Sequence, residues 1–493
     1  MNRFIVILGF MSILFLVSAM FLNISHFDLL RLEKILAADG SFDGPAASAF
    51  RALDKGLLIA GLMILLLAIV FFFISRSKTG LFFWSDRKYL FFLLGFKLII
   101  CLVYISITPY EPWTDDLWFY EQAINLSNGV DPQNMDGQPT ALWPIGYPLL
   151  LSIFFRIIAP MIWVGQIVNI LLLLGITLVT YLLTGILFDS RLARQASLVI
   201  AFMPSQIFFA IPLMSDVLFA FLILVLIFLT ARKQSILNTL LLGIVFGLSV
   251  LTKPVILFFP LGLATYWIAK GEKLKPVVLR TIIVLIVGGA ILVPWQIRNY
   301  RVFGQFVLVS TQGGRNLWTG NHPNASGGYM STQDFIPQNL LEQMEGMNEA
   351  QRDRIQFEQG ISWILSNPIQ AISLWPKKFV RLFFEDSRCV SRSTHLSYKR
   401  IPPYIVSAMT LVTEGFYYSL SLSFIISLYF IFRYEKISPR IWLFVGTILY
   451  FIIIHMPFLT EGRYHMPLIP LFAIVACVPR SYYDRRSVKA EIR

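Results

Sequence analysis

The chain has 493 residues, of which 56% are hydrophobic and only 14% are charged, and its mean hydropathy is +0.69. This composition argues against a soluble protein and predicts membrane-spanning helices. The net charge of +13 fits the Lys and Arg bias of cytoplasmic membrane loops; without a basic soluble domain, it gives no reason to expect nucleic acid as a partner. Three scattered cysteines form no CxxC pair, so neither a metal site nor a disulfide framework is expected.

Apolar runs long enough to cross a bilayer recur along the chain and predict about twelve spans. The runs lie roughly at 4–22, 56–75, 89–108, 163–187, 195–211, 214–231, 236–252, 254–269, 278–296, 412–432, 440–457 and 464–479. The first run is longer than the apolar region of most signal peptides and has no clear small-residue cleavage site after it. We therefore expect an uncleaved first span.

The short loops "DSRLAR", "ARKQ" and "KGEKLK", the loop after the second span and the C-terminal tail are all basic. The positive-inside rule places them on the cytoplasmic side, together with the N-terminus. One short apolar stretch, 146–160, would reverse this pattern if it crossed the membrane, and it contains Arg156 and ends at Pro160. We therefore expect it to form an interfacial helix within an outer loop at 109–162.

These assignments divide the chain into four regions. Residues 1–88 provide two extra N-terminal spans with an outer loop, 89–296 form a transmembrane core, 297–411 form an extracytoplasmic segment, and 412–493 hold the C-terminal spans and a short cytoplasmic tail. Within 297–411, the first part is rich in Gly and Asn and predicts turns and short strands, 348–367 predicts a helix ending before Pro368, and 369–386 predicts an interfacial helix. The expected fold class is an all-α integral membrane protein with a small extracytoplasmic α/β segment.

Acidic and basic residues gather at the outer ends of the predicted helices. The acids are Asp115 and Asp116 in "PWTDDLWFYEQA", Asp216 in "MSDVLF" and Glu461; the bases are Lys253, Arg298, Arg301, Arg463 and His465. Charge close to a bilayer is costly and usually has a partner. Each residue alone could be solvated or snorkelling, but the set predicts a site for an anionic lipid headgroup beside a carboxylate.

Two simpler interpretations remain open for residues in this region. The Asp pair could cap the helix that it begins and favour its positive end. Four tryptophans could either stack on a sugar or anchor the chain at the membrane interface; they are Trp113, Trp118, Trp143 and Trp318. The five histidines have no metal-ligand spacing, and there is no GxSxG or P-loop motif, so no cofactor is expected.

Several segments follow one another in an order that resembles a known superfamily. They run from "DDLWFYEQAINLSNG" through "SDVLFAFLILVLIFL" and "GLSVLTKPVILFFPL" to "EGRYHMPLIPLFAIVA", and the most specific is "PWQIRNYRVFGQFVLVSTQGGRNLWTGNHP". Over roughly residues 89–480, the chain resembles the bacterial GT-C glycosyltransferases related to protein O-mannosyltransferases and lipid A aminoarabinose transferases. The resemblance implies a GT-C fold, a polyprenyl-phosphate-linked sugar donor, no metal, and an active site on the extracytoplasmic side of the bacterial inner membrane.

The resemblance also implies roles for individual residues. Asp116 matches the acidic residue of the first outer loop, and Asp216 matches a second acidic position that is often Glu in relatives. Lys253 occupies a place often filled by Arg, and Arg298 and Arg463 match basic positions of the RNY and RY motifs. Together with the residues that gather at the helix ends, the expected site is Asp116, Asp216 and Asp115 for catalysis, Lys253, Arg298 and Arg463 for the donor phosphate, and Tyr120, Tyr464 and Glu461 as substrate contacts.

The expected function is therefore the transfer of a sugar from a polyprenyl-phosphate donor to an unknown envelope acceptor (a lipid, glycan or protein), with inversion at the anomeric carbon. Its expected partners are the donor, the acceptor and the lipid bilayer. The alternative is a transporter or flippase of a lipid-linked sugar. That alternative predicts inverted repeats or helices broken near the bilayer midplane, and the sequence shows neither.

Overall fold

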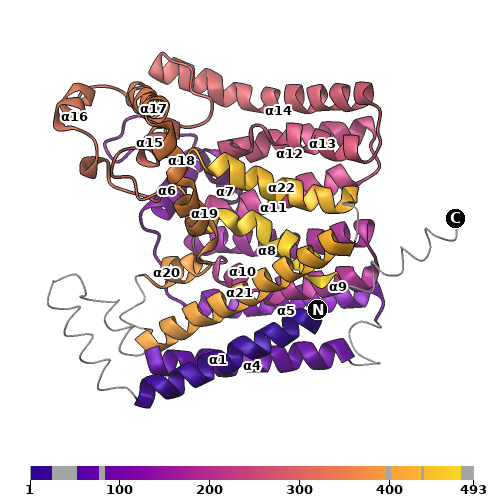
Figure 1. Ribbon diagram of the computed structural model, residues 1–493. Coiled ribbons are helices and arrows are strands. Elements are labelled where there is room, and N and C mark those ends of the chain that lie inside the picture. The colour runs from indigo at the N-terminus through magenta and orange to yellow at the C-terminus, as the bar shows by residue number, and fades with distance from the viewer. Residues whose placement is uncertain (1, 25–52, 77–83, 396–400, 435–437, 479–493) are drawn as a thin grey trace.

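The computed structural model describes residues 2–24, 53–76, 84–395, 401–434 and 438–478. Figure 1 shows a bundle of long helices with a group of short helices at one end. The described residues form no strand, and one isolated β-bridge joins Gln133 to Pro139. The expected all-α class is confirmed. The loop expected within 1–88 and the cytoplasmic tail fall largely on 25–52 and 479–493, outside the described residues.

Long apolar helices dominate the bundle. Within the described residues, five are long and apolar enough to cross a membrane: α4 (Leu53–Arg76), α5 (Asp86–Ile107), α8 (Ile162–Leu187), α14 (Leu274–Phe303) and α21 (Pro403–Tyr434). Shorter apolar helices accompany them, including α1 (Asn2–Ile24), α11 (Ser215–Ala231), α12 (Ile236–Thr252) and α22 (Pro439–His455). The protein is therefore a multi-pass membrane protein.

Three of the expected spans are interrupted helices. The run 195–211 forms α9 (Ser190–Phe202) and α10 (Pro204–Phe208), and 254–269 forms the 3₁₀ turn η2 (Pro254–Ile256) and α13 (Phe259–Ala269). The run 464–479 forms the 3₁₀ helix η4 (Gly462–Leu468) and α23 (Ile469–Cys477). Prolines lie at each interruption, and because proline has no backbone N–H it disfavours a continuous α-helix there.

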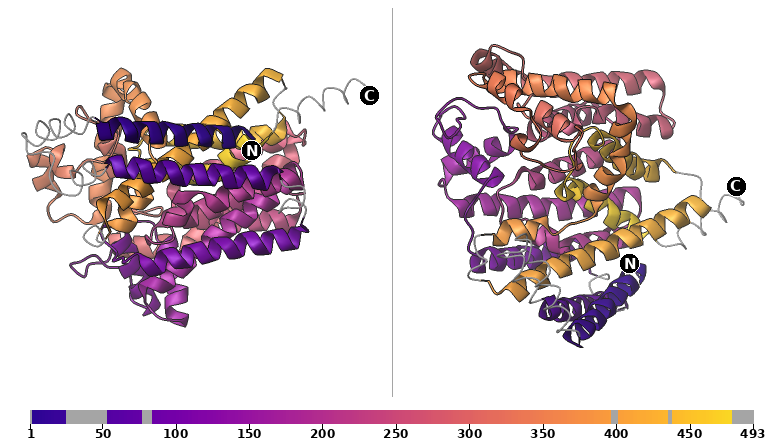
Figure 2. Two further views of the ribbon diagram at one scale, coloured as in Figure 1. Left: turned by 90° about the horizontal axis from the view of Figure 1, so that it is seen from below. Right: turned by 60° about the vertical axis from the view of Figure 1, so that its left-hand side comes forward.

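The two N-terminal helices pack side by side on one flank of the bundle, at the bottom of Figure 1, where both contact α21. The Phe4 ring meets Phe71 edge-on at 5.6 Å and Phe416 at 5.1 Å, joining α1, α4 and α21. Figure 2 shows the α1–α4 pair from two further sides. This packing is distant in sequence from the acids and bases of the predicted site.

The short helices lie between α14 and α21, at the left of Figure 1. They are α15 (Gly313–Thr319), η3 (Thr332–Asp334), α16 (Gln338–Met344), α17 (Glu349–Ser366), α18 (Pro368–Ser373), α19 (Trp375–Phe383) and α20 (Arg388–Thr394), called here the α15–α20 segment. The helix expected at 348–367 is confirmed as α17, which Asn348 caps. The helix expected at 369–386 is divided into α18 and α19 near Pro376.

The expectation of short strands after residue 297 is wrong for the described residues. Helix α14 continues to Phe303 and ends at Gly304, whose φ is +66°; the Gly-rich stretch then begins α15. A Cβ on Gly314 would lie 1.9 Å from the backbone oxygen of Asp353. The glycine therefore permits α15 to pack closely on α17, rather than serving a strand turn.

The stretch expected as an interfacial helix forms α7 (Gly146–Ile157), which packs against α6 (Asp115–Ser127), α8 and α12. Leu149, Ile153 and Ile157 are exposed on α7, so the helix keeps an apolar face away from these neighbours. The helix itself is confirmed, and its place at the membrane interface stays a prediction.

Candidate active site

The predicted acids lie at the starts of two helices. Asp115 and Asp116 are the first residues of α6, and Asp216 is the second residue of α11. The helix dipole favours negative charge at these positions. Thr114 is the N-cap of α6, has a φ of +53° and makes no capping hydrogen bond through its side chain. The Asp pair is therefore not the N-cap, and its carboxylates contact basic side chains instead.

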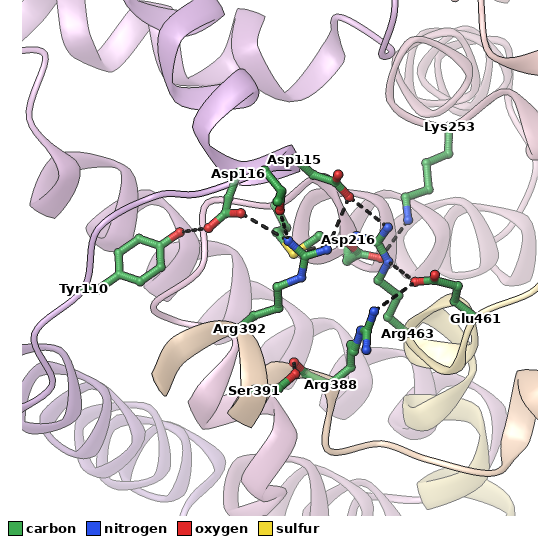
Figure 3. Close-up of polar contacts among 12 residues, drawn as sticks. Tyr110, Asp115, Asp116, Asp216, Lys253, Arg388, Ser391, Arg392, Glu461 and Arg463 are labelled. Atoms are coloured by element: carbon green, nitrogen blue, oxygen red, sulfur yellow. Dashed lines mark hydrogen bonds and ion pairs between the residues drawn. The ribbon is translucent and has the colours of Figure 1, made fainter. Parts of the chain in front are cut away.

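Two predicted bases reach these acids. Lys253, at the C-terminal end of α12, donates from Nζ to Asp216 Oδ1 at 2.7 Å. Arg463, in η4, donates to Asp115 Oδ2 at 3.0 Å and lies 3.7 Å from Asp216 Oδ2 and 3.3 Å from Glu461 Oε2. Figure 3 shows these side chains converging from separate elements. The structure thus joins five of the predicted site residues in one network of ion pairs and hydrogen bonds.

A third base, Arg392 of α20, was not among the predicted residues. Its guanidinium lies 3.3 Å from Asp116 Oδ1 and 3.5 Å from Asp115 Oδ2, and it donates to the Thr114 hydroxyl at 2.5 Å. Arg388, one turn earlier, lies 4.0 Å from Glu461. The signal that could have found them is their i, i+4 spacing, which puts both on one helix face after an amphipathic segment.

Tyr110 was also not predicted, and it contacts Asp116 from the opposite side. Its hydroxyl donates to Asp116 Oδ2 and accepts from the backbone N–H of Leu213 at 3.2 Å. Burial raises the pKa of Asp116 above the usual range of a carboxyl group, while the contacts from Tyr110 and Arg392 oppose that rise by stabilising the carboxylate.

The cluster retains unused hydrogen-bonding capacity. Asp216 is only 2% exposed, yet its Oδ2 has no hydrogen-bond partner within the described structure. Glu461 Oε2 and Arg463 Nε also lack one there, despite their charged neighbours. Buried polar atoms are nearly always satisfied, so three unsatisfied atoms in one cluster call for a partner such as solvent or a ligand.

Two cavities with no lining residue in common border the cluster, one through Glu461 and the other through Asp115. The first is a groove of about 790 Å³ beside α19 and η4; it is lined by Lys377, Arg381 and Arg388, by Glu461 and by apolar residues that include Val380 and Phe384. The second, of about 670 Å³, begins at Thr114 and Asp115 and extends between α6, α15 and α17; Trp118 and Trp143 form part of its wall. We call them the basic groove and the α6–α17 cavity.

Other predicted residues lie elsewhere. Arg298 donates from Nε to Asp131 Oδ1 at 2.9 Å and from Nη1 to the Thr140 backbone oxygen at 3.0 Å, and none of the described hydrogen bonds or ion pairs joins it to the cluster. The Tyr120 hydroxyl donates to the Pro160 backbone oxygen at 2.9 Å. Tyr464 does lie in the cluster, with its ring centroid 5.1 Å from Lys253 Nζ.

Two of the four predicted tryptophans also lie away from the two cavities. Trp113 stacks on His395 at 3.5 Å, and Trp318 is buried edge-on against Phe335. Only Trp118 and Trp143 reach a cavity beside the acids. Across the described ranges, no three His, Cys, Asp or Glu side chains are arranged to hold a metal ion, and whether the protein needs one stays untested.

Helices, cluster and cavities together define a multi-pass membrane protein with a buried acid–base site at the end of the bundle nearest the α15–α20 segment. Residues 143–297 match the family described as dolichyl-phosphate-mannose-protein mannosyltransferase. This confirms the expected resemblance for that part of the chain, which includes Asp216 and Lys253 but neither Asp116 nor Arg463. None of the curated proteins compared matches the chain.

Several solved structures are similar to this one, including the following two. The oligosaccharyltransferase of Archaeoglobus fulgidus in the apo form gives a TM-score of 0.47 at 15% identity, over 83% of this chain and 52% of that chain. ArnT from Cupriavidus metallidurans bound to undecaprenyl phosphate gives a TM-score of 0.42 at 13% identity, over 82% of this chain and 79% of that chain. The chain thus spans about half the length of the archaeal enzyme.

Proposed function

We propose that the protein is a glycosyltransferase that moves a sugar from a polyprenyl-phosphate-linked donor to an acceptor of the cell envelope. The reaction takes place at the extracytoplasmic face of the bacterial inner membrane. The observation that carries this proposal is the network joining a buried carboxylate, Asp116, through Arg392 and Asp115 to Arg463 and Lys253. The match of residues 143–297 to a mannosyltransferase family supports the same chemistry.

The leaving group of this reaction is a phosphate monoester, which is already a stable anion. It needs positive charge at the oxygen that separates from the sugar more than it needs a proton. Lys253 and Arg463 are placed to supply that charge in a partly dehydrated site, where such contacts are stronger than in water. Arg298 is paired with Asp131 outside the cluster, so this mechanism does not depend on it.

Asp116 is the proposed general base. The acceptor hydroxyl gives its proton to the Asp116 carboxylate while its oxygen forms a bond to the anomeric carbon, and the bond from that carbon to the phosphate oxygen breaks. Attack opposite the leaving phosphate inverts the anomeric configuration. General-base help of this kind typically contributes about a hundred- to ten-thousand-fold in rate. Asp216 and Asp115 position the cations and the acceptor.

The basic groove is the proposed route for the donor. Trp375, Phe379 and Phe384 are exposed on or just after α19, as expected for a helix that meets the apolar part of a bilayer. Lys377 and Arg381 lie among them and line the groove, which reaches Glu461 in the cluster. A lipid phosphate entering from the membrane would therefore meet cations before it reaches Arg463.

The test is sugar transfer in proteoliposomes that contain the full chain and a radiolabelled polyprenyl-phosphate sugar, with envelope extract as acceptor. Asp116→Asn keeps the size and shape of the side chain but removes its charge and basicity, and it replaces one acceptor oxygen with an NH2 donor. We expect transfer to fall by at least about a hundredfold, with donor binding retained. Glu358→Gln is the matched control, because it also neutralises one carboxylate but on the exposed side of α17.

Unchanged transfer in Asp116→Asn would remove Asp116 as the base. Movement of the labelled lipid between leaflets without any transfer would favour the flippase alternative.

A further inference from the structure

The α6–α17 cavity differs in chemistry from the basic groove, although both border the same cluster. Five carboxylates line it against two guanidinium groups: Asp115, Glu121, Asp136, Glu349 and Asp353 against Arg315 and Arg352. Three cations line the basic groove against two carboxylates: Lys377, Arg381 and Arg388 against Glu385 and Glu461. The two cavities therefore present opposite excess charge to whatever enters them.

Some of the cavity acids have structural partners. Glu349 accepts hydrogen bonds from the Thr140 hydroxyl at 2.6 Å and the Ala141 N–H at 2.9 Å, which ties α17 to the loop after α6. Asp353 accepts from the Gly314 N–H at 2.7 Å at the start of α15, and burial raises its pKa to about 6. Glu121 and Asp136, in contrast, are exposed on the wall of the cavity.

The cavity also contains indole rings suited to a sugar. Trp118 and Trp143 belong to its wall, and aromatic faces provide a flat apolar surface for the C–H face of a pyranose. The Trp118 Nε1 atom is buried and has no hydrogen-bond partner among the described residues. Because this N–H is covered by protein, we assign the sugar contact to the indole face rather than to the N–H.

We propose that the α6–α17 cavity binds the acceptor, and that this acceptor is a glycan without phosphate or carboxylate groups at its reacting end. This inference rests on the proposed function. The anionic donor is drawn to the basic groove, whereas the acid excess of the α6–α17 cavity repels a second anion. Charge thus directs each substrate to its own cavity beside the cluster.

The test measures binding to the purified full-length protein in nanodiscs, without donor, of three soluble tetrasaccharides. These are chitotetraose, its fully de-N-acetylated cationic form and its 6-phosphorylated form. We expect the cationic probe to bind most tightly and the phosphorylated probe least tightly at low salt. We also expect added salt to reduce the difference in affinity between the cationic and phosphorylated probes, because salt screens exposed charges.

Two variants locate the binding in the cavity. In Glu121→Gln with Asp136→Asn, the cationic probe should bind roughly three- to tenfold more weakly, and neutral chitotetraose should change by less than about twofold. Trp118→Phe keeps an aromatic ring but removes the larger indole face, so we expect neutral chitotetraose to bind about fivefold more weakly. Glu358→Gln removes a charge from α17 outside the cavity and should not change the order of the probes.

Tightest binding of the phosphorylated probe, failure of all three probes to bind, or an unchanged preference in the double variant would overturn the acceptor assignment. None of these outcomes bears on sugar transfer, which the Asp116→Asn experiment tests separately. The expected order of binding without transfer to any acceptor would instead retain a glycan site and reject the proposed function.

Discussion

Lys253 Nζ lies 2.7 Å from Asp216 Oδ1, and this pair joins the C-terminal end of α12 to the N-terminal end of α11. Asp216 is only 2% exposed, so its negative charge is separated from water and depends on its cationic neighbours. Arg463 is farther away, 3.7 Å from the other carboxylate oxygen. Removing one member of such a pair costs more than removing both, because a buried charge is left behind.

The first prediction follows from this asymmetry. Lys253→Met should lower the free energy of unfolding of the detergent-solubilised protein by about 3 kcal/mol, because the Asp216 carboxylate loses its shortest charged contact. Lys253→Met with Asp216→Asn should recover much of that loss but not sugar transfer. Thermal unfolding of the single and double variants measures the first effect, and the proteoliposome assay measures the second. Equal instability of the two variants would contradict the prediction.

The second prediction concerns pH and the contact between Tyr110 and Asp116. A general base works as the carboxylate, so transfer falls as pH drops through the pKa of Asp116, which burial raises above the usual range. The Tyr110 hydroxyl stabilises the carboxylate and lowers that pKa. Tyr110→Phe should therefore move the acid limb of the pH–rate profile to higher pH.

Tyr120→Phe is the control for this measurement. It removes a hydroxyl from α6 that donates to Pro160 rather than to Asp116, so the acid limb should stay where it is in the unmodified protein. A limb that moves to lower pH in Tyr110→Phe, or one that moves equally in both variants, would show that the limb does not report on Asp116.

Much of the fold could be predicted because membrane helices are encoded locally. A long apolar run without charges identifies a helix whatever surrounds it, and α8 and α12 coincide with the expected runs within a residue. The breaks within three of the expected spans were missed because a hydropathy window averages over a proline that ends a helix. The Gly-rich start of the α15–α20 segment was misread as strands because Gly314 serves a helix contact with Asp353 of α17, far along the chain.

The acids and bases of the site could be predicted because they lie at helix ends that come together at one end of the bundle. Asp116, Asp216, Lys253 and Arg463 each follow or begin an apolar run, so their shared location follows from the order of the helices. Arg298 has the same local signal, yet its ion pair with Asp131 depends on a loop whose path the sequence does not show.

Arg392 and Tyr110 were missed because neither belongs to an apolar run, and the i, i+4 spacing of Arg388 and Arg392 marks a helix face without showing what that face contacts. Both reach Asp116 only through tertiary packing.

The third prediction tests Arg392. Its planar guanidinium contacts Thr114, Asp115 and Asp116 together, and a lysine ammonium is a single point charge that does not reproduce this forked geometry. Arg392→Lys should therefore lower kcat for sugar transfer by roughly tenfold to a hundredfold, while the KM for the donor changes little. Steady-state kinetics with varied donor concentration separate the two parameters.

The comparison variant is Arg388→Lys. Arg388 lies 4.0 Å from Glu461 and lines the basic groove, so its replacement should raise the donor KM more than it lowers kcat. If Arg392→Lys changed only the donor KM, Arg392 would bind donor rather than position the acids.

The fourth prediction concerns Gly462, which begins η4 immediately before Arg463. A Cβ on Gly462 would lie 2.5 Å from the backbone oxygen of Glu385, and backbone atoms there cannot move aside cheaply. Gly462→Ala should therefore shift η4 and lengthen the contact from Arg463 to Asp115, which is 3.0 Å in the present structure. We expect transfer to fall by at least about tenfold, because a displacement of about 1 Å in a site is costly.

Gly95→Ala is the matched control for Gly462→Ala. Gly95 lies within α5, and a Cβ there would meet nothing within 4 Å, so the same chemical change should leave transfer intact and slightly favour the helix. Thermal unfolding of both variants separates a local shift from a general loss of folding. If Gly462→Ala transferred sugar as fast as Gly95→Ala, the position of Arg463 would not depend on the close approach of η4 to Glu385, and the charge network would have to tolerate that displacement.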